Sequence, residues 1–332
     1  MSYDTIQLDK SLYAASQGFT KALESADPTE QYRGTPLGEL DAYERQLKRF
    51  GIRVGGAGSD RVEKFFQSAE TSVLFPEYIA RAVRQGMERA DVLPRIAATT
   101  TRIEGLDYRS IETSAGTGNP ESAVAEGDLL PETKVRTKTK LIGMHKHGRL
   151  LSASYEAIRF HRLDLFTVTL RQIGAEIAKT LLADAVDVLI HGDGGSGVAA
   201  GTVAMAGTNI AYADLIKLWD SFEPFEMTTL LAPTGMMQKL LALAELRDAA
   251  AGLNFHGTGK LVTPLGAELI KSNAVAAGSI LALDKYAALE MVTAGGVVTD
   301  YDKLIDRQLE RAAISTIVGF AKVHAGAVKV LA

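Results

Sequence analysis

Four patterns of polar residues in the sequence could support chemistry. The first is a glycine-rich loop, His191–Gly197, with the sequence HGDGGSG. It follows a segment with helical periodicity and lacks the Gly-Lys-Ser/Thr ending of a phosphate-binding loop. Ser196 is not in the Gly-x-Ser-x-Gly arrangement of a hydrolase nucleophile, because Val198 occupies the last glycine position. We therefore interpret this loop as the end of a helix followed by a hinge.

Two pairs of titratable residues form the second and third patterns. His145 and His147 would share one face of a strand, but a metal site needs three or four ligands, and Lys146 adds positive charge beside them. Asp184 and Asp187 lie one helical turn apart, as an acid and a base could, yet they are also typical of a solvated helix face. We predict no catalytic residue, no metal site and no cofactor.

The fourth pattern is a run of alternating basic residues. One face of a predicted strand over residues 133–141 carries Lys134, Arg136, Lys138 and Lys140, while the opposite face is mostly threonine. A surface for oligonucleotides would interleave aromatic side chains, and this strand has none. We favour an acidic protein surface as the partner, with an oligonucleotide as the alternative. Because little buries the threonine face, we expect a hairpin arm that must lie on something else.

Composition excludes several classes of protein. The 332 residues include no cysteine, which excludes disulfides, Cys-ligated zinc, iron–sulfur clusters and thiol catalysis. The net charge of -4 provides no global field for nucleic acid. The first ten residues contain two aspartates and no apolar run, so we predict no secretory signal. The uncharged stretch 194–213 is rich in glycine and poor in large apolar residues, so we predict no membrane span.

The N-terminal part of the sequence predicts short helices. One helix should begin at Pro36 and end at Gly51, and Ser59 should cap a second. Both have a narrow apolar stripe, so we expect them to pack on a neighbour rather than on a core of their own. The apolar segment 73–97 is interrupted at Pro76 and Pro94.

Further along, the pattern alternates between extended and helical segments. Strand-like residues 103–114 precede a soft loop at 115–120. Residues 164–190 carry the strongest helical periodicity, with Asp164 as candidate N-cap and Gly192 as the stop. Short strands are predicted near residues 228–231, 279–283, 286–292, 312–320 and 327–331, and a helix from Met237 to Gly252. Helices and strands are segregated, which indicates an α+β fold.

The order of these parts resembles the major capsid protein of tailed bacteriophages, the Hong Kong 97-type fold. The similar segments are Ala125–Asp128 with Pro131, Leu150–Ser154, Ala183–Gly194 and Gly319–His324. The resemblance extends from about Val73 to Ala332. It implies an N-terminal extension over 1–72, an N-arm over 73–107, an E-loop region over 108–149 and a peripheral domain with a long spine helix over 150–194. An axial domain would follow over 195–298, and 299–332 would return to the peripheral domain.

The resemblance implies a structural protein and not an enzyme. Such proteins self-assemble in the host bacterial cytoplasm, as hexamers and pentamers that form an icosahedral virion shell. The shell encloses double-stranded DNA, which the proteins contact non-specifically. Scaffold, portal and decoration proteins are further expected partners, and no membrane is. The E-loop residues Lys134, Arg136, Lys138 and Lys140 would contact a neighbouring subunit. The alternatives are an encapsulin-type compartment and, from another class, a soluble α+β enzyme.

Two departures from the family bear on how the shell is held. Some members join a lysine of the E-loop to an asparagine of a neighbour, but here no asparagine follows Asn273. We therefore expect non-covalent contacts alone. Some members also lose an N-terminal segment on maturation; here we expect the first seventy residues to stay as an arm between subunits.

Overall fold

A computed structural model describes residues 3–13, 18–115, 123–193, 198–247 and 261–332. Three expected features lie partly or wholly outside these residues. They are positions 116–120 of the soft loop expected at 115–120, residues 194–197 of the glycine-rich loop, and the end of the helix expected up to Gly252. The chain divides into two compact units. We call Met1–Asp91, His147–Ala178 and Val297–Thr316 the helical unit, and Val92–Lys146, Lys179–Gly296 and Ile317–Ala332 the sheet unit.

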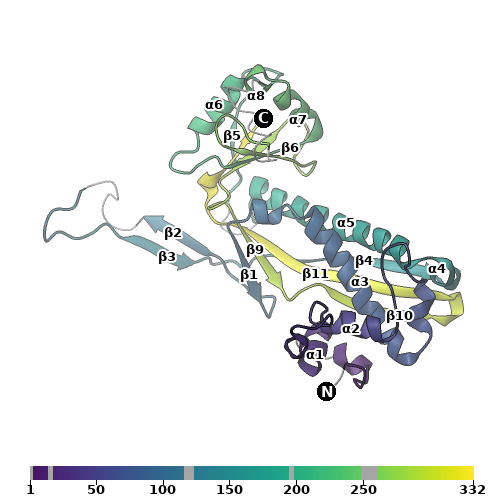
Figure 1. Cartoon of the computed structure of the whole chain (residues 1–332). Helices are drawn as coiled ribbons and strands as arrows, with labels where there is room; N and C mark the ends of the chain where they lie inside the picture. The colour runs from purple at the N-terminus through teal and green to yellow at the C-terminus, as the bar shows by residue number, and fades with distance from the viewer. Residues whose placement is uncertain (1–2, 14–17, 116–122, 194–197, 248–260) are drawn as a thin grey trace. The chain divides into compact units, whose positions relative to one another are not determined.

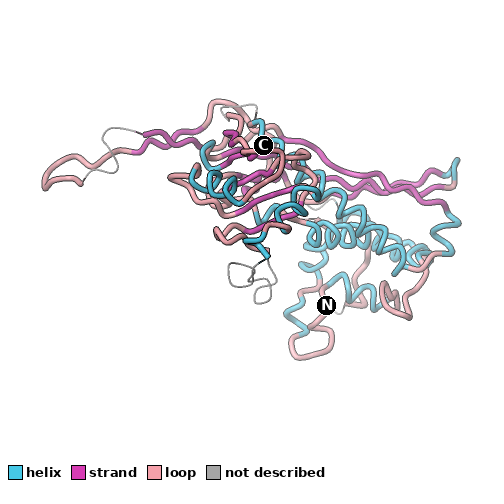
Figure 2. The backbone as a smooth tube through the Cα atoms, turned by 90° about the horizontal axis from the view of Figure 1, so that it is seen from above, coloured by secondary structure: helices cyan, strands magenta, loops and turns pink. Residues whose placement is uncertain are grey.

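The helical unit contains most of the long helices (Figure 1). In chain order its elements are η1 (Lys10–Tyr13), α1 (Phe19–Ala26), η2 (Thr29–Tyr32), α2 (Ala42–Arg49), η3 (Val62–Phe66), α3 (Ala69–Ala90), α4 (Tyr155–Phe160) and β10 (Val298–Leu304), with η5 (Ile305–Arg307) after it. β4 (Met144–Ser154), α5 (Leu163–His191) and β11 (Leu309–Lys322) begin or end in the other unit. β10 and β11 pair antiparallel over seven residues, Val298 with Ser315 to Leu304 with Leu309, as two adjacent strands in Figure 2.

The first seventy residues pack within their own chain, so the expectation that their helices lack a core of their own is wrong. Leu23, Tyr43 and Phe65 are buried, and the Tyr43 hydroxyl donates a hydrogen bond to the Leu74 carbonyl of α3 at 3.2 Å. The helix expected from Pro36 is shorter and begins at Ala42, because the Asp41 side chain closes a capping box there.

Pro76 does not interrupt helix α3, contrary to the sequence prediction. Proline removes one backbone donor and displaces the carbonyl of the preceding turn. Here the hydroxyl of Tyr13 lies between two backbone groups of α3, accepting from the Glu77 N–H at 3.1 Å and donating to the Val73 carbonyl at 2.8 Å. These are groups four residues apart, which a regular helix would pair directly. The N-terminal segment thus satisfies the backbone of α3 where the proline disturbs it.

Helix α5 matches the strongest sequence signal. Its 29 residues span about 43 Å. Leu170, Ile177 and Leu181 of the predicted stripe are buried. Gly192, with a φ of 94°, follows its last residue as predicted. Asp164 is not the N-cap, because the helix already begins at Leu163; its carboxylate lies in the first turn and accepts from the Leu165 N–H at 2.8 Å.

Two glycines bring α3 and α5 into backbone contact within the helical unit. A Cβ on Gly174 would lie 2.0 Å from the Val83 carbonyl oxygen, and one on Gly86 would lie 2.1 Å from the Arg171 carbonyl oxygen. Distances this short leave no room for a methyl group, so the helices cross where both side chains are absent.

The sheet unit contains η4 (Leu93–Arg95) and most of the strands. One sheet has the order β5-β12-β8-β6-β7, and another has β1-β9-β11-β10 with β4 also paired to β11. Their remaining strands are β1 (Thr99–Ile103), β5 (Gly201–Val203), β6 (Thr229–Ala232), β7 (Glu268–Lys271), β8 (Ile280–Leu283), β9 (Leu289–Ala294) and β12 (Val328–Leu331). Helices α6 (Tyr212–Asp220), α7 (Thr234–Leu241) and α8 (Ala244–Arg247) contribute to the core of the first sheet, with Leu218, Leu230 and Leu240 fully buried.

The end of the chain differs from the expected boundaries. Residues 299–332 do not return as one piece, because β12, after the turn η6 (Ala325–Ala327), pairs with β5 and β8 of the first sheet. β9, expected in the axial domain, pairs with β1 and β11 of the second sheet. The α+β class is confirmed. No helix among the described residues has the length and hydropathy needed to cross a bilayer.

Candidate functional site

The predicted hairpin is present in the sheet unit as a separate two-stranded sheet (Figure 1). β2 (Ile111–Ala115) pairs antiparallel with β3 (Thr133–Thr137), from Ile111 opposite Thr137 to Ala115 opposite Thr133. Every residue of β3 is exposed. The strand-like segment expected at 103–114 is two strands, because residues 104–110 leave β1 and turn into the hairpin.

Three of the four predicted basic residues are exposed near β3. Lys134, Arg136 and Lys140 lie at the surface. The Lys134 ammonium is 3.7 Å from a carboxylate oxygen of Glu132, and Glu112 lies opposite Arg136 in the strand register. This face therefore mixes basic and acidic groups, which the sequence of one strand alone did not reveal.

Lys138 is buried, and its prediction as an exposed contact residue is wrong. The strand ends at Thr137, so the alternation of faces no longer applies at the next residue. Its ammonium lies 3.1 Å from an Asp193 carboxylate oxygen and donates to the Lys322 carbonyl at 2.7 Å. Both side chains of the ion pair are less than a tenth exposed. Lys138 thus stabilises its own subunit.

A second buried lysine adjoins this pair. Lys322 is 1% exposed, and its ammonium donates to the Val198 carbonyl at 2.7 Å. Burial lowers the pKa of Lys322 to about 8; nearby Asp193 raises the pKa and Lys138 lowers it further. Sequence periodicity gave no sign of this cluster, because its members come from three distant segments.

The lowered pKa of Lys322 predicts stability that rises with pH. Between pH 8 and about 10.5 the unfolded chain binds the proton that the folded chain has released, so the free energy of unfolding increases with pH. From pH 8 to pH 10 we expect the wild type to gain about 2–3 kcal/mol relative to Lys322→Met, which lacks the titrating group. Urea unfolding of both proteins at each pH measures the difference. An equal pH dependence in the two proteins would contradict the assignment.

The other strand of the hairpin is held by a buried carboxylate. Glu290 of β9 is 5% exposed and accepts hydrogen bonds from three hydroxyl groups. Thr101 and Tyr108 donate to one carboxylate oxygen, each at 2.8 Å, and Ser110 donates to the other. Ser110 directly precedes β2, so Glu290 fixes the residue at which this strand begins.

The hairpin also carries exposed apolar side chains, which the pattern of alternating basic residues did not indicate. Leu129 and Leu130, in the connection between the strands, are 96% and 78% exposed, and Val135 and Ile111 are more than half exposed. Leaving several large apolar side chains in water is unfavourable, and exposed apolar side chains gathered on one structural element are typical of interaction surfaces. The Leu129–Leu130 pair, which lies between Asp128 and Pro131, is the sequence signal that could have indicated it.

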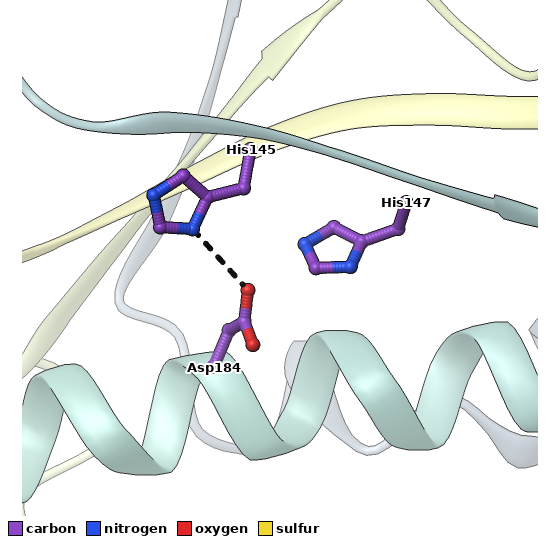
Figure 3. A group of neighbouring side chains, drawn as sticks. All are labelled: His145, His147 and Asp184. Carbon is purple, nitrogen blue, oxygen red and sulfur yellow. Dashed lines mark ion pairs between the residues drawn. The ribbon is translucent and has the colours of Figure 1, made fainter.

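The predicted histidine and aspartate pairs have other partners. His145 Nδ1 lies 3.5 Å from Asp184 Oδ2 in the sheet unit (Figure 3), and His147 follows on the same strand. Asp187 lies 2.7 Å from Nδ1 of His191, one turn further along α5. Asp184 and Asp187 thus contact different histidines. Both side chains of the Asp187–His191 pair are 70% exposed, so this pair contributes at most about 1 kcal/mol and Asp187 fits a solvated helix face. Asp184 is 30% exposed, and its carboxylate lies within 4.8 Å of ring nitrogens of both His145 and His147.

An exposed hairpin that carries large apolar side chains is typical of a protein that contacts other molecules. Residues 137–329, more than half of the chain, match the family model described as phage capsid protein. The chain therefore belongs to the phage capsid protein family: it is a structural protein of the virion capsid and not an enzyme. No curated protein matches the sequence.

Solved structures share the fold at low sequence identity. A virus-like particle from Pyrococcus furiosus is 13% identical with a TM-score of 0.53, covering 77% of this chain and 98% of the other. The capsid of a native GTA particle is 15% identical with a TM-score of 0.53, covering 74% and 89%. A structure from Microbacterium phage Oxtober96 is 13% identical with a TM-score of 0.51, covering 73% and 90%. These likenesses confirm the predicted Hong Kong 97-like fold.

Proposed function

We propose that copies of this chain assemble as hexamers and pentamers into a closed icosahedral phage head around double-stranded DNA, inside the host bacterial cytoplasm. The observation that carries the proposal is the exposed hairpin: its strands pair only with each other among the described residues, and its connection presents Leu129 and Leu130 to water. Contact with a second copy would remove these side chains from water, gaining about 25 cal/mol per Å² of apolar area.

Multiplicity would make such contacts sufficient without covalent bonds. The sequence has no cysteine and no asparagine after Asn273, so neither a disulfide nor the lysine–asparagine cross-link of related shells is supported. Each subunit would touch several neighbours, and linked contacts raise the overall affinity far above that of one contact. Contacts with scaffold, portal and decoration proteins, and non-specific contact with DNA, are part of the same proposal.

Purification of the expressed full-length chain tests the assembly. We expect sedimentation and electron microscopy to show hollow icosahedral particles, and boiling in detergent to release a single band near 35.5 kDa. Extraction of DNA from particles made during infection supports a phage head, whereas a protein cargo would indicate an encapsulin-type compartment. A stable monomer at high concentration would contradict the proposal.

Reversal of the exposed hairpin charges tests the contact that we assign to them. In the variant Lys134→Glu/Arg136→Glu we expect at least a tenfold lower yield of particles, because two cations that would face an acidic surface become anions. The subunit should keep its wild-type circular dichroism, since both side chains are exposed. The yield is measured by sedimentation.

The matched control is Lys134→Arg/Arg136→Lys, which keeps both charges and should assemble like the wild type. Lys138 is left unchanged because reversing it would bury a second carboxylate beside Asp193. Normal particles of unchanged thermal stability from the charge-reversed variant would exclude these residues from the interface.

A further inference from the structure

The hairpin meets the rest of the sheet unit at a pair of buried residues. Ser110 and Lys138 lie one register position beyond the last strand pair, Ile111 opposite Thr137, and the Lys138 N–H donates to the Ser110 carbonyl at 2.8 Å. Ser110 is fully buried and Lys138 is 6% exposed, whereas Ile111 and Thr137 are exposed. We call Ser110 and Lys138 the hairpin root, since exposure changes abruptly there on both strands.

Each residue of the hairpin root contacts a different buried carboxylate, which we call its anchor. The Lys138 ammonium contacts the Asp193 carboxylate and the Lys322 carbonyl, and the Ser110 hydroxyl donates to the Glu290 carboxylate. Glu290 also accepts from Thr101 and Tyr108, so three hydroxyl groups in all hold its carboxylate. The two anchors are independent, since they share no side chain.

These anchors make movement of the root expensive. Withdrawing Lys138 would break a buried ion pair and take a cation away from the buried Asp193 carboxylate, which is strongly unfavourable. An isolated two-stranded hairpin, in contrast, is marginal in water and would not hold a direction by itself. The direction of this hairpin is therefore set at its root and not along its length.

We propose that Lys138 and Glu290 are positioning residues that lock the hairpin root, so that the hairpin points in one direction before it meets another copy of the chain. The effect of this lock on assembly rests on the proposed shell: a hairpin that is already held in place loses less conformational freedom when it docks on another copy. The lock itself is a property of the single subunit. The two ideas can therefore fail separately.

Spin labels on the unassembled full-length chain test the lock. The absence of cysteine allows labels at two introduced positions, Glu132→Cys in the hairpin and Tyr286→Cys, which is 72% exposed in the same unit. Pulsed electron paramagnetic resonance on labelled chain diluted into unlabelled chain gives the distribution of distances between the two labels. We expect a narrow distribution in this parent and at least a doubled width after Lys138→Met or Glu290→Gln. Lys134→Met, which removes an exposed charge from the same hairpin, should leave the width unchanged.

If Lys138→Met or Glu290→Gln does not fold, two milder variants test whether the hairpin root is locked. Asp193→Asn weakens one anchor while keeping an acceptor, and Ser110→Ala removes one hydrogen bond of the other; each should widen the distribution. A broad distribution in the parent, or equal widths in the parent and the root variants, would overturn the proposal. A narrow parent distribution in a chain that never forms particles would support the lock and reject the shell.

Discussion

Replacing Gly174 by alanine is expected to lower the free energy of unfolding of the helical unit by about 3 kcal/mol or more, although alanine favours helices. In a solvated helix this change stabilises by up to about 1 kcal/mol. Here the added Cβ would lie 2.0 Å from the Val83 carbonyl oxygen and 2.8 Å from the Met87 nitrogen, both backbone atoms of α3. The two helices must separate to admit it, and dispersion contacts along their whole crossing are then weakened.

Urea unfolding followed by circular dichroism measures this effect. The matched control is Gly235→Ala in α7, where a Cβ would have no heavy atom within 4 Å and stability should be unchanged or slightly raised. Gly86→Ala, whose Cβ would meet the Arg171 carbonyl oxygen, should resemble Gly174→Ala. Wild-type stability in both Gly86→Ala and Gly174→Ala would mean that the helices do not cross in backbone contact.

Replacing Arg45 by methionine should release the N-terminal segment from the helical unit, at a cost of about 3–5 kcal/mol. Arg45 and Asp27 are fully buried, with Nε 2.6 Å from the carboxylate of Asp27. The same guanidinium donates to the carbonyls of Asp27 and Leu40, each at 2.5 Å, and lies 4.6 Å from the centre of the Tyr32 ring. Methionine would fill the volume but leave the Asp27 carboxylate buried without its cation.

Limited proteolysis and thermal unfolding measure the release. We expect cleavage before Ser68 to become at least tenfold faster in Arg45→Met. Arg33→Met removes an ion pair to Glu30 in which both side chains are 81% exposed, so it should change the rate little. Arg45→Met/Asp27→Asn, which removes both charges, should recover part of the loss. Equal cleavage of all four proteins would show that the buried pair does not hold the segment.

Limited proteolysis would also test whether the first seventy residues are part of the fold of one subunit. The resemblance to phage capsid proteins predicts that they serve as an arm between subunits, and that role stays a prediction. The structure adds that the segment is part of the fold of one subunit: Tyr13 hydrogen-bonds within α3, and Arg81 of α3 pairs with Asp41 at 2.6 Å. Any contact with another copy would therefore be made by a folded surface.

Local patterns in the sequence predict those elements whose signals come from residues near one another in the chain. The periodicity of α5 placed Leu170, Ile177 and Leu181 on its buried side, because a helix turns at a fixed angle per residue. The alternation after residue 133 predicted the exposed strand, and the order of such elements carried the resemblance to phage capsid proteins. These inferences needed only neighbours in the chain.

Tertiary structure decided the roles that depend on distant neighbours. Lys138 has the same type and spacing as Lys134 and Arg136, yet it is buried because Asp193 and Lys322 lie beside it. Pro76 remains within a helix because Tyr13 supplies the missing partners. Periodicity reports which face of an element a residue occupies, but burial of a charge depends on whether a compensating group arrives from elsewhere in the chain. That group is selected by the packing of the whole unit, which one element's sequence does not contain.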